Sequence, residues 1–270
     1  MKRAAVILAG GVGTRLRPLS SDDNPKQFLR LFAGRSLIQL TYDRVSQLAS
    51  DVYVSTNERY APLVREHVPE ATIVAEPARR NTAPAIALSC FAAERELGDC
   101  VIAVLPSDHF IGDEAEFARV LGRAYDFAEK HDELMTIGIA PAEPTSEYGY
   151  LQLGGEIEPG IIRLERFVEK PPRERAEQFL RAGNYAWNAG MFVWRASVFR
   201  RALEAAAPVV ATVTRENYES MPDISIDYAL MEKATRVAAL RGDFGWSDVG
   251  SFDALRRLGA LPEESRGVLP

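Results

Sequence analysis

The stretch at residues 4–20, AAVILAGGVGTRLRPLS, decides how the chain is interpreted. Its first six residues are apolar, and a short run of this kind predicts a strand buried on both faces of a parallel sheet. A glycine-rich turn at residues 10–13 follows directly, and Arg15 and Arg17 come next. Glycines let the backbone approach an anion and point its N–H groups at it, and Arg15 can bind two phosphate oxygens at once. The segment therefore predicts a phosphate-binding loop.

Other interpretations of the same segment are weaker but open. The spacing GxGxxL lacks the third glycine of the dinucleotide-binding fingerprint, and no acidic residue follows a second strand at the usual distance. A Walker A loop requires a Gly-Lys-Ser/Thr ending, which this turn does not have. A signal peptide is disfavoured by the short apolar run, so we expect a mature, cytoplasmic N-terminus. For the glycines alone, an ordinary strand-to-helix turn is the favoured interpretation.

Composition narrows the class of protein. The chain has 270 residues, of which 47% are hydrophobic, and this is enough for a sizeable core in one large domain or two small ones. A net charge of -6 argues against a nucleic-acid partner. No apolar run approaches the roughly 20 residues of a membrane helix, so no membrane partner is expected. Cys90 and Cys100 are expected to be buried thiols in a reducing compartment.

Hydrophobic patterning predicts an α/β fold with a Rossmann-like, mostly parallel sheet and helices on both faces. The predicted strands of a nucleotide lobe at about 1–140 are residues 4–9, 52–55, 72–75, 101–105 and 134–139. The helices between them are residues 37–49, 58–68, 82–97 and 114–130. Ligands of such sheets bind at the carboxyl ends of the strands, so the turns after the strands should converge on one crevice.

A smaller lobe is predicted at about 141–250, because the alternation of strands and helices becomes less regular there. Its predicted strands are residues 148–153, 161–168 and 190–195, and its predicted helices are residues 173–182, 198–206 and 226–233. We expect both lobes to form one catalytic domain at 1–261, followed by a frayed tail at 262–270.

Two aspartates are candidates for a magnesium site. Asp108 follows an apolar strand in the turn PSDH, and Asp248 lies in GWSDVGS, between Trp246 and Gly250. Mg²⁺ commonly uses one or two carboxylates together with substrate phosphate oxygens. A lone aspartate at such a turn is more often a helix cap, and spacing alone does not bring these two together.

Charged and polar residues elsewhere suggest a second, sugar-binding region. Lys26 in NPKQF and Lys170 in FVEKPP can reach phosphates as point charges, although a solvated lysine is the commoner case. Glu169 ends an apolar strand beside Lys170 and can accept hydrogen bonds from hydroxyl groups. A polyhydroxylated ring also requires aromatic faces, amides and carboxylates, as supplied by Tyr148-Gly149, Trp187-Asn188-Ala189-Gly190 and Asp227. Packing is the simpler role for each of these alone, and no metal pattern of histidines or Ser/His/Asp nucleophile is present.

Taken together, the motifs resemble a known family. GGVGTRLRPLS, PKQF, EPARRNTAPAI, PSDH, YGY, FVEKP, WNAGMF, SIDYALMEK and GWSDVGS occur in the order found in sugar-1-phosphate nucleotidyltransferases. The resemblance runs from residue 4 to about residue 258 and is strongest to the bacterial mannose-1-phosphate guanylyltransferases. It implies the nucleotide-diphospho-sugar transferase fold and transfer of GMP from GTP to mannose 1-phosphate. The expected reaction uses Mg²⁺ and no covalent enzyme intermediate.

The resemblance also implies a role for individual residues. The catalytic set is Arg15, Lys26, Asp108, Lys170 and Asp248, with Asp108 and Asp248 holding magnesium. The nucleotide site comprises Leu8, Ala9, Gly10, Gly11, Gly13, Thr14, Arg15, Lys26, Glu76, Asn81, Thr82, Ala83, Pro106, Ser107 and Asp108. The sugar-phosphate site comprises Tyr148, Gly149, Glu169, Lys170, Asn188, Ala189, Gly190 and Asp227.

The chain departs from the family pattern at Val12, Arg17, Arg79 and Phe252. None of these changes removes a charge that the reaction requires, but they affect the expected packing of the loop and the shape of the base site. A related enzyme that uses another sugar or base, and a non-catalytic GDP-sugar sensor, therefore stay open as alternatives. Relatives often carry a C-terminal extension, and a homo-oligomer is also left open.

Overall fold

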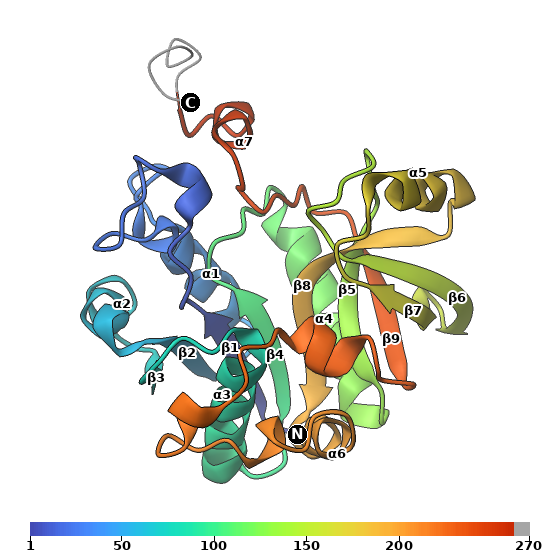
Figure 1. Cartoon of the computed structure of the whole chain (residues 1–270), viewed down its shortest axis with the longest axis horizontal. Helices are drawn as coiled ribbons and strands as arrows, with labels where there is room; N and C mark the ends of the chain where they lie inside the picture. The colour runs from blue at the N-terminus through green and yellow to red at the C-terminus, as the bar shows by residue number, and fades with distance from the viewer. Residues whose placement is uncertain (262–270) are drawn as a thin grey trace.

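The computed structural model describes residues 1–261, and within them one nine-stranded sheet forms the centre of the molecule (Figure 1). The strand order is β3-β2-β1-β4-β8-β5-β9-β7-β6. The strands are β1 (Arg3–Leu8), β2 (Asp51–Asn57), β3 (Thr72–Glu76), β4 (Val101–Pro106), β5 (Leu134–Ile139), β6 (Tyr150–Glu158), β7 (Ile161–Val168), β8 (Tyr185–Arg195) and β9 (Val237–Gly242).

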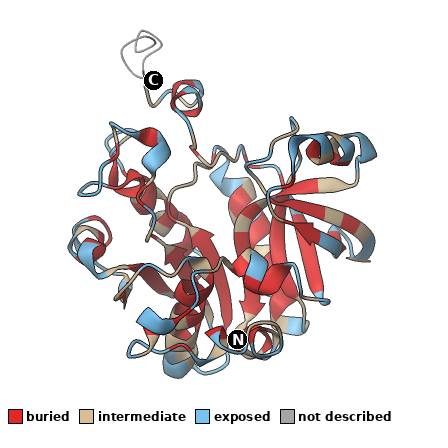
Figure 2. Ribbon diagram, in the orientation of Figure 1, coloured by how far each residue is buried: buried red, intermediate tan, exposed pale blue. Residues whose placement is uncertain are grey.

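Helices cover both faces of this sheet. They are α1 (Leu37–Ser46), α2 (Ala61–His67), α3 (Thr82–Leu97), α4 (Glu114–Lys130), α5 (Arg173–Ala182) and α6 (Ala196–Ala206), whereas α7 (Phe252–Arg257) lies away from the sheet (Figure 1). One hydrophobic core contains α3 and α6, and a second contains α1, α2 and α4. Figure 2 shows central strands such as β1, β4 and β5 almost continuously buried between these layers, as expected for strands that are covered on both faces, whereas β6 and β7 carry exposed residues.

The sheet has a parallel half and a mixed half. Strands β3, β2, β1 and β4 are parallel, so their carboxyl ends lie at one edge. Strand β8 then pairs antiparallel with both β4 and β5, and β5 pairs parallel with β9. The hairpin of β6 and β7 completes the sheet. The α/β class predicted from the sequence is confirmed, and β8 joins the two halves into one continuous sheet.

A bulge in β8 brings side chains of the WNAGMF motif to the functional edge. Thr136 of β5 pairs with Phe192, and Gly138 pairs with Asn188. One residue of β5 therefore lies opposite three residues of β8, and Gly190 in the bulge has a φ of 67°. Residues of a bulge leave the regular ladder, which redirects their side chains.

Several predicted boundaries were correct and others were wrong. The helices predicted at 82–97, 114–130 and 173–182 have the predicted bounds. The strand predicted at 190–195 begins at Tyr185, because Asn188 and Gly190, which have the composition of a turn, lie inside the strand, Asn188 beside the bulge and Gly190 within it. The strand predicted from residue 148 begins at Tyr150.

In the C-terminal part of the described chain, the observed helices and strands also differ from the predicted ones. The helix predicted at 226–233 is a π-helix at Asp227–Met231, and β9 and α7 were not predicted. Helix α7 packs with Leu16 and Val249 in a small core, and so supports the segment that follows the glycine-rich turn. The predicted tail at 262–270 lies outside the described residues.

Cys90 and Cys100 are buried, free thiols, as predicted. Among residues 1–261, no helix has the length and apolar character needed to cross a membrane.

Candidate active site

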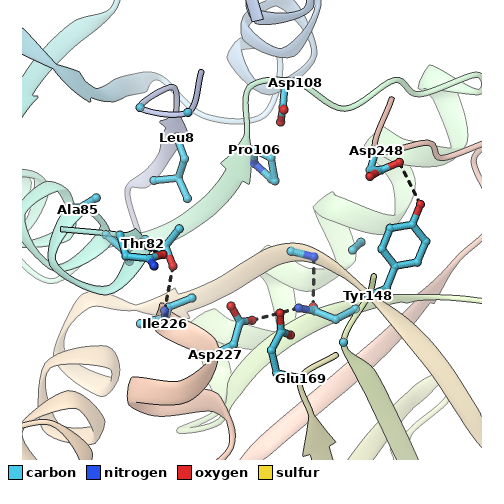
Figure 3. Close-up of a pocket in the computed structure, with 18 of the residues that line it drawn as sticks. Leu8, Thr82, Ala85, Pro106, Asp108, Tyr148, Glu169, Ile226, Asp227 and Asp248 are labelled. Atoms are coloured by element: carbon cyan, nitrogen blue, oxygen red, sulfur yellow. Dashed lines mark hydrogen bonds between the residues drawn. The ribbon is translucent and has the colours of Figure 1, made fainter. Parts of the chain in front are cut away.

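A cavity of about 930 Å³ opens at the carboxyl ends of the central strands (Figure 3). The predicted site residues that line it are Leu8, Gly10, Gly11, Arg15, Glu76, Asn81, Thr82, Pro106, Asp108, Tyr148, Gly149, Glu169, Lys170, Asn188, Ala189, Gly190, Asp227 and Asp248. The structure therefore brings together residues that are up to 240 positions apart in the sequence.

Six predicted residues do not line the cavity. They are Ala9, Gly13, Thr14, Lys26, Ala83 and Ser107. Most of them lie directly behind its wall: the Ala9 carbonyl accepts hydrogen bonds from Gln27 and Thr56, and the Ser107 N–H donates to the Leu8 carbonyl. Ala83 is fully buried at the start of α3. The positions of Ala9, Ala83 and Ser107 suit a role in shaping the site from beneath its lining residues.

The glycine-rich turn is shaped around Lys26. Gly13 has a φ of 70°, and a Cβ at this position would lie 2.3 Å from the Lys26 Cβ. A side chain at Gly13 is therefore incompatible with both the backbone conformation and the packing. Gln27 donates from Nε2 to the carbonyls of Ala9 and Gly11 at 2.9 Å each, which fixes the turn from behind.

Lys26 links the two predicted metal-binding aspartates. Its side chain is 4% exposed, and Nζ donates to Asp108 Oδ2 at 2.8 Å and to the backbone carbonyl of Asp248 at 2.5 Å. Burial acts to raise the pKa of Asp108, but Lys26 and His109 outweigh it, so the pKa lies below its usual range. Asp108 is thus a carboxylate at neutral pH.

The Asp248 carboxylate is held by two side-chain donors. The Tyr148 hydroxyl donates to Oδ1 at 2.9 Å, and Arg15 Nη2 donates to Oδ2 at 3.2 Å. Arg15 also bonds Glu147 at 2.7 Å through Nη1. Arg15 therefore connects the glycine-rich segment with the loops that carry Glu147 and Asp248.

His109 and Trp246 pack beside the aspartates. The Trp246 indole N–H donates to His109 Nδ1 at 3.1 Å, so the hydrogen of a neutral imidazole lies on Nε2. Burial lowers the pKa of His109 to about 4, although Asp108 opposes this shift. At neutral pH the ring is uncharged, and its Nε2 lies 4.0 Å from Asp108 Oδ1.

Glu76 lies at the end of the cavity next to Gly10 of the glycine-rich turn. It is 6% exposed, and its carboxylate accepts hydrogen bonds from the hydroxyls of Ser55 and Tyr218, both at 2.8 Å. Burial raises its pKa even though both hydrogen bonds oppose the shift. Nearby, the Asn81 side chain caps α3, and the Thr82 hydroxyl accepts from the Ile226 N–H at 2.9 Å.

A cluster of carboxyl and amide groups forms the opposite end. Figure 3 shows Glu169 and Asp227 side by side, and Asn188 Nδ2 donates to Asp227 Oδ1 at 3.2 Å. Burial first, and then the Glu169 charge, raise the pKa of Asp227 to about 7. Lys170 has a left-handed backbone with a φ of 42°, and its ammonium lies 3.0 Å from Glu169 Oε1.

Further residues line the cavity that were not among the predicted site residues. They are Arg79, Arg80, Ala85, Ile86, His109, Ser146, Glu147, Phe192, Asp223, Ile226 and Trp246. Eight of them lie inside a quoted motif, so the motifs marked their segments although no role was assigned to these positions. Asp223 lies outside every motif, and no local signal marks it.

The fold and the cavity define a class of protein. A glycine-rich turn after the first strand, a buried lysine between two aspartates and a distant carboxyl and amide cluster are typical of an α/β protein that binds a nucleotide beside a polar second ligand. The Nucleotidyl transferase family description matches residues 4–264. The chain belongs to the nucleotidyl transferase family.

Individual relatives agree with this family. The chain is 39% identical to the xanthan biosynthesis protein XanB of Xanthomonas campestris, over 93% of this chain and 58% of that protein. It is also 39% identical to a putative mannose-1-phosphate guanylyltransferase of Vibrio cholerae, over 93% of this chain and 59% of that protein. The chain thus spans somewhat under three-fifths of the length of these relatives.

Solved structures share the fold. A Thermus thermophilus structure described as mannose-1-phosphate geranyltransferase has a TM-score of 0.89 and 34% identity, covering 97% of this chain and 80% of that one. A Helicobacter pylori structure described as mannose-6-phosphate isomerase has a TM-score of 0.80 and 27% identity, covering 92% of this chain and 100% of that one.

Proposed function

We propose that the chain transfers GMP from GTP to mannose 1-phosphate, giving GDP-mannose and pyrophosphate. The observation that carries this proposal is one continuous cavity, which has a phosphate-type loop at one end, a carboxyl and amide cluster at the other, and two aspartates in its lining that both contact the buried Lys26. Relatives named mannose-1-phosphate guanylyltransferase support the choice of substrates.

The proposed chemistry is one in-line displacement. A phosphate oxygen of mannose 1-phosphate attacks the α-phosphorus of GTP, a new P–O bond forms, and the bond to the β-phosphate breaks with release of pyrophosphate. Catalysis then consists of positioning and charge stabilisation. In this proposal Arg15 and the N–H groups of Gly10 and Gly11 bind the triphosphate, and Lys26 lies close enough to stabilise charge on the transferred phosphate.

Asp108 and Asp248 fit a magnesium site. Their carboxylates are hard oxygen ligands, Lys26 donates to the Asp108 carboxylate and to the backbone carbonyl of Asp248, and the Asp108 side chain is 33% exposed. Within residues 1–261 no group of three His, Cys, Asp or Glu side chains could hold a metal, so the remaining ligands would be phosphate oxygens and water. A bound Mg²⁺ would neutralise phosphate charge, and Tyr148 and Arg15 hold the Asp248 carboxylate in place for it.

Glu76 is the candidate for base selection. Guanine carries two adjacent donor groups, N1–H and the exocyclic amine, and a carboxylate can accept from both. Adenine has a donor next to an acceptor on the corresponding edge, so it matches a carboxylate less well. The bonds from Ser55 and Tyr218 fix the orientation of the Glu76 carboxylate.

The opposite cluster supplies the chemistry of sugar recognition. Glu169 and Asp227 can accept hydrogen bonds from hydroxyl groups, and Asn188 can donate one. Lys170 is 59% exposed and can exchange its contact with Glu169 for one with the sugar phosphate. We also place the protein in the cytoplasm, because buried free Cys90 and Cys100 suit a reducing compartment.

The test is pyrophosphate release in a matrix of nucleotides and sugar 1-phosphates. We expect the highest kcat/KM with GTP and mannose 1-phosphate, and an Asp108→Asn variant serves as a matched control of nearly unchanged shape. Higher activity with another pair would establish a related enzyme with a different sugar or base. Binding of GDP-mannose with no turnover of any pair would instead indicate a sensor.

A further inference from the structure

Thr136 lies behind the sugar end of the cavity, and the function above does not account for it. It is fully buried in the middle of β5, opposite the bulge of β8. Its hydroxyl lies 3.0 Å from Asn188 Oδ1 and 3.1 Å from the Met191 carbonyl oxygen. One O–H group is thus shared between two acceptor oxygens, the Met191 carbonyl inside the bulge and the side chain of Asn188 next to it.

The bulge creates the need for this hydroxyl. Regular pairing would give every carbonyl of β8 a ladder partner, but three residues of β8 lie opposite one residue of β5. A buried carbonyl without a donor is costly, so a hydroxyl on the facing strand stabilises the irregular segment. Valine at this position would fill the same space without the donor.

The same contacts fix the orientation of the Asn188 carboxamide. Gly190 N–H is an unambiguous donor, and it bonds Asn188 Oδ1 at 3.1 Å. Together with Thr136 it holds Oδ1 against the bulge, so Nδ2 faces Asp227 Oδ1 at 3.2 Å. A carboxamide has two N–H groups on Nδ2, and the second one is available to a ligand hydroxyl.

We propose that Thr136 is a positioning residue for sugar recognition, which acts by orienting Asn188 from the neighbouring strand of the sheet. The proposal rests on the proposed function, because it takes the Asn188 end of the cavity as the sugar site. Thr136 does not line the cavity and contacts no ligand itself. Its effect should therefore fall on the sugar phosphate and not on the nucleotide at the other end.

The experiment compares Thr136→Val with Thr136→Ser, which keeps the hydroxyl. Calorimetric Kd and steady-state KM are measured for mannose 1-phosphate and for GTP, with the rest of the sugar 1-phosphate panel as further probes. We expect Thr136→Val to weaken sugar-phosphate binding roughly three- to tenfold, the value of one hydrogen bond, with the GTP values within twofold. Thr136→Ser should restore most of the affinity. Thr136→Ala replaces the valine variant if that variant does not fold.

A double-mutant cycle separates positioning from general damage. In an Asn188→Ala background the oriented amide is gone, so Thr136→Val should change the sugar-phosphate Kd by less than twofold. The proposal for Thr136 would be overturned if Thr136→Val changed the sugar-phosphate Kd by the same factor in both backgrounds. It would also be overturned if the single variant lost GTP binding in parallel, or if its sugar-phosphate Kd were unchanged. If wild-type protein binds none of the sugar 1-phosphates, the sugar site itself is wrong and both proposals fall.

Discussion

Replacing Asp227 with asparagine should make the protein more stable at alkaline pH while weakening its sugar site. Asp227 is held beside Glu169 at the buried end of the cavity, and its pKa is raised to about 7 by burial and by that neighbouring charge. The ordinary aspartate pKa is 3.8, so the shift is about three units. At 1.36 kcal/mol per unit, ionisation in the folded state costs up to about 4 kcal/mol.

The sign of the pH dependence follows from the direction of this shift. Between about pH 4 and pH 7 the folded protein keeps a proton on Asp227 that the unfolded chain has lost. The contribution of protonated Asp227 to the stability of the folded protein is therefore fully present below about pH 4 and is lost as the pH rises through about 7. The asparagine of the Asp227→Asn variant has no proton to lose, and its amide oxygen can still accept the hydrogen bond from Asn188 Nδ2.

Urea unfolding of wild type and Asp227→Asn between pH 5 and pH 8.5 measures the effect. The variant should be more stable by roughly 1.5 kcal/mol at pH 5 and by up to about 4 kcal/mol at pH 8. Asp243→Asn, at an exposed position after β9, is the matched control. Its free energy of unfolding should differ from that of wild type by the same amount at every pH. A difference for Asp227→Asn that is the same at pH 5 and pH 8 would refute the reasoning.

Three other substitutions test the phosphate end of the cavity. Lys26→Met removes the cation between the aspartates and should reduce the rate of pyrophosphate release at least a hundredfold; a loss below tenfold would exclude a catalytic role. Gly13→Ala places a Cβ 2.3 Å from the Lys26 Cβ at a φ of 70°, and should lower the free energy of unfolding in urea by about 1–2 kcal/mol or more. The matched variant Gly11→Ala meets no atom within 4 Å and should lower it by less than about 0.5 kcal/mol. Equal losses would contradict the packing argument. Tyr148→Phe removes the 2.9 Å bond to Asp248 and should slow turnover several-fold with a stability change below about 1.5 kcal/mol, as measured by steady-state kinetics and thermal melting. An unchanged rate would show that the hydroxyl does not position the carboxylate.

Local patterns in the sequence predicted the parallel half of the sheet well. Strands such as β1 and helices such as α3 are specified by continuous apolar runs, glycines and caps close to them in the chain. The course of β8 could not be predicted in this way. Asn188 and Gly190 have the composition of a turn, and only pairing with β5 shows that they form a bulge inside a strand.

In the candidate site too, local sequence indicated the residues, but their contacts depend on distant parts of the chain. Motif composition identified Asp108, Asp248 and Lys26, but their mutual contacts depend on loops that are more than 80 residues apart in the sequence. Lys26 was expected to reach phosphates, and the structure adds that it connects the two aspartates. Thr136 carries no signal in the sequence, because its role arises only from the strand that faces it.

The most direct test of the central proposal follows the phosphorus atoms in a single reaction. GTP labelled at the α-phosphate is incubated with the protein, mannose 1-phosphate and Mg²⁺, and the products are separated by chromatography. The account predicts that the label appears in GDP-mannose, that unlabelled pyrophosphate forms in equal amount, and that no label remains on the protein. Labelled protein, or label found only in free GMP, would contradict direct transfer to the sugar phosphate.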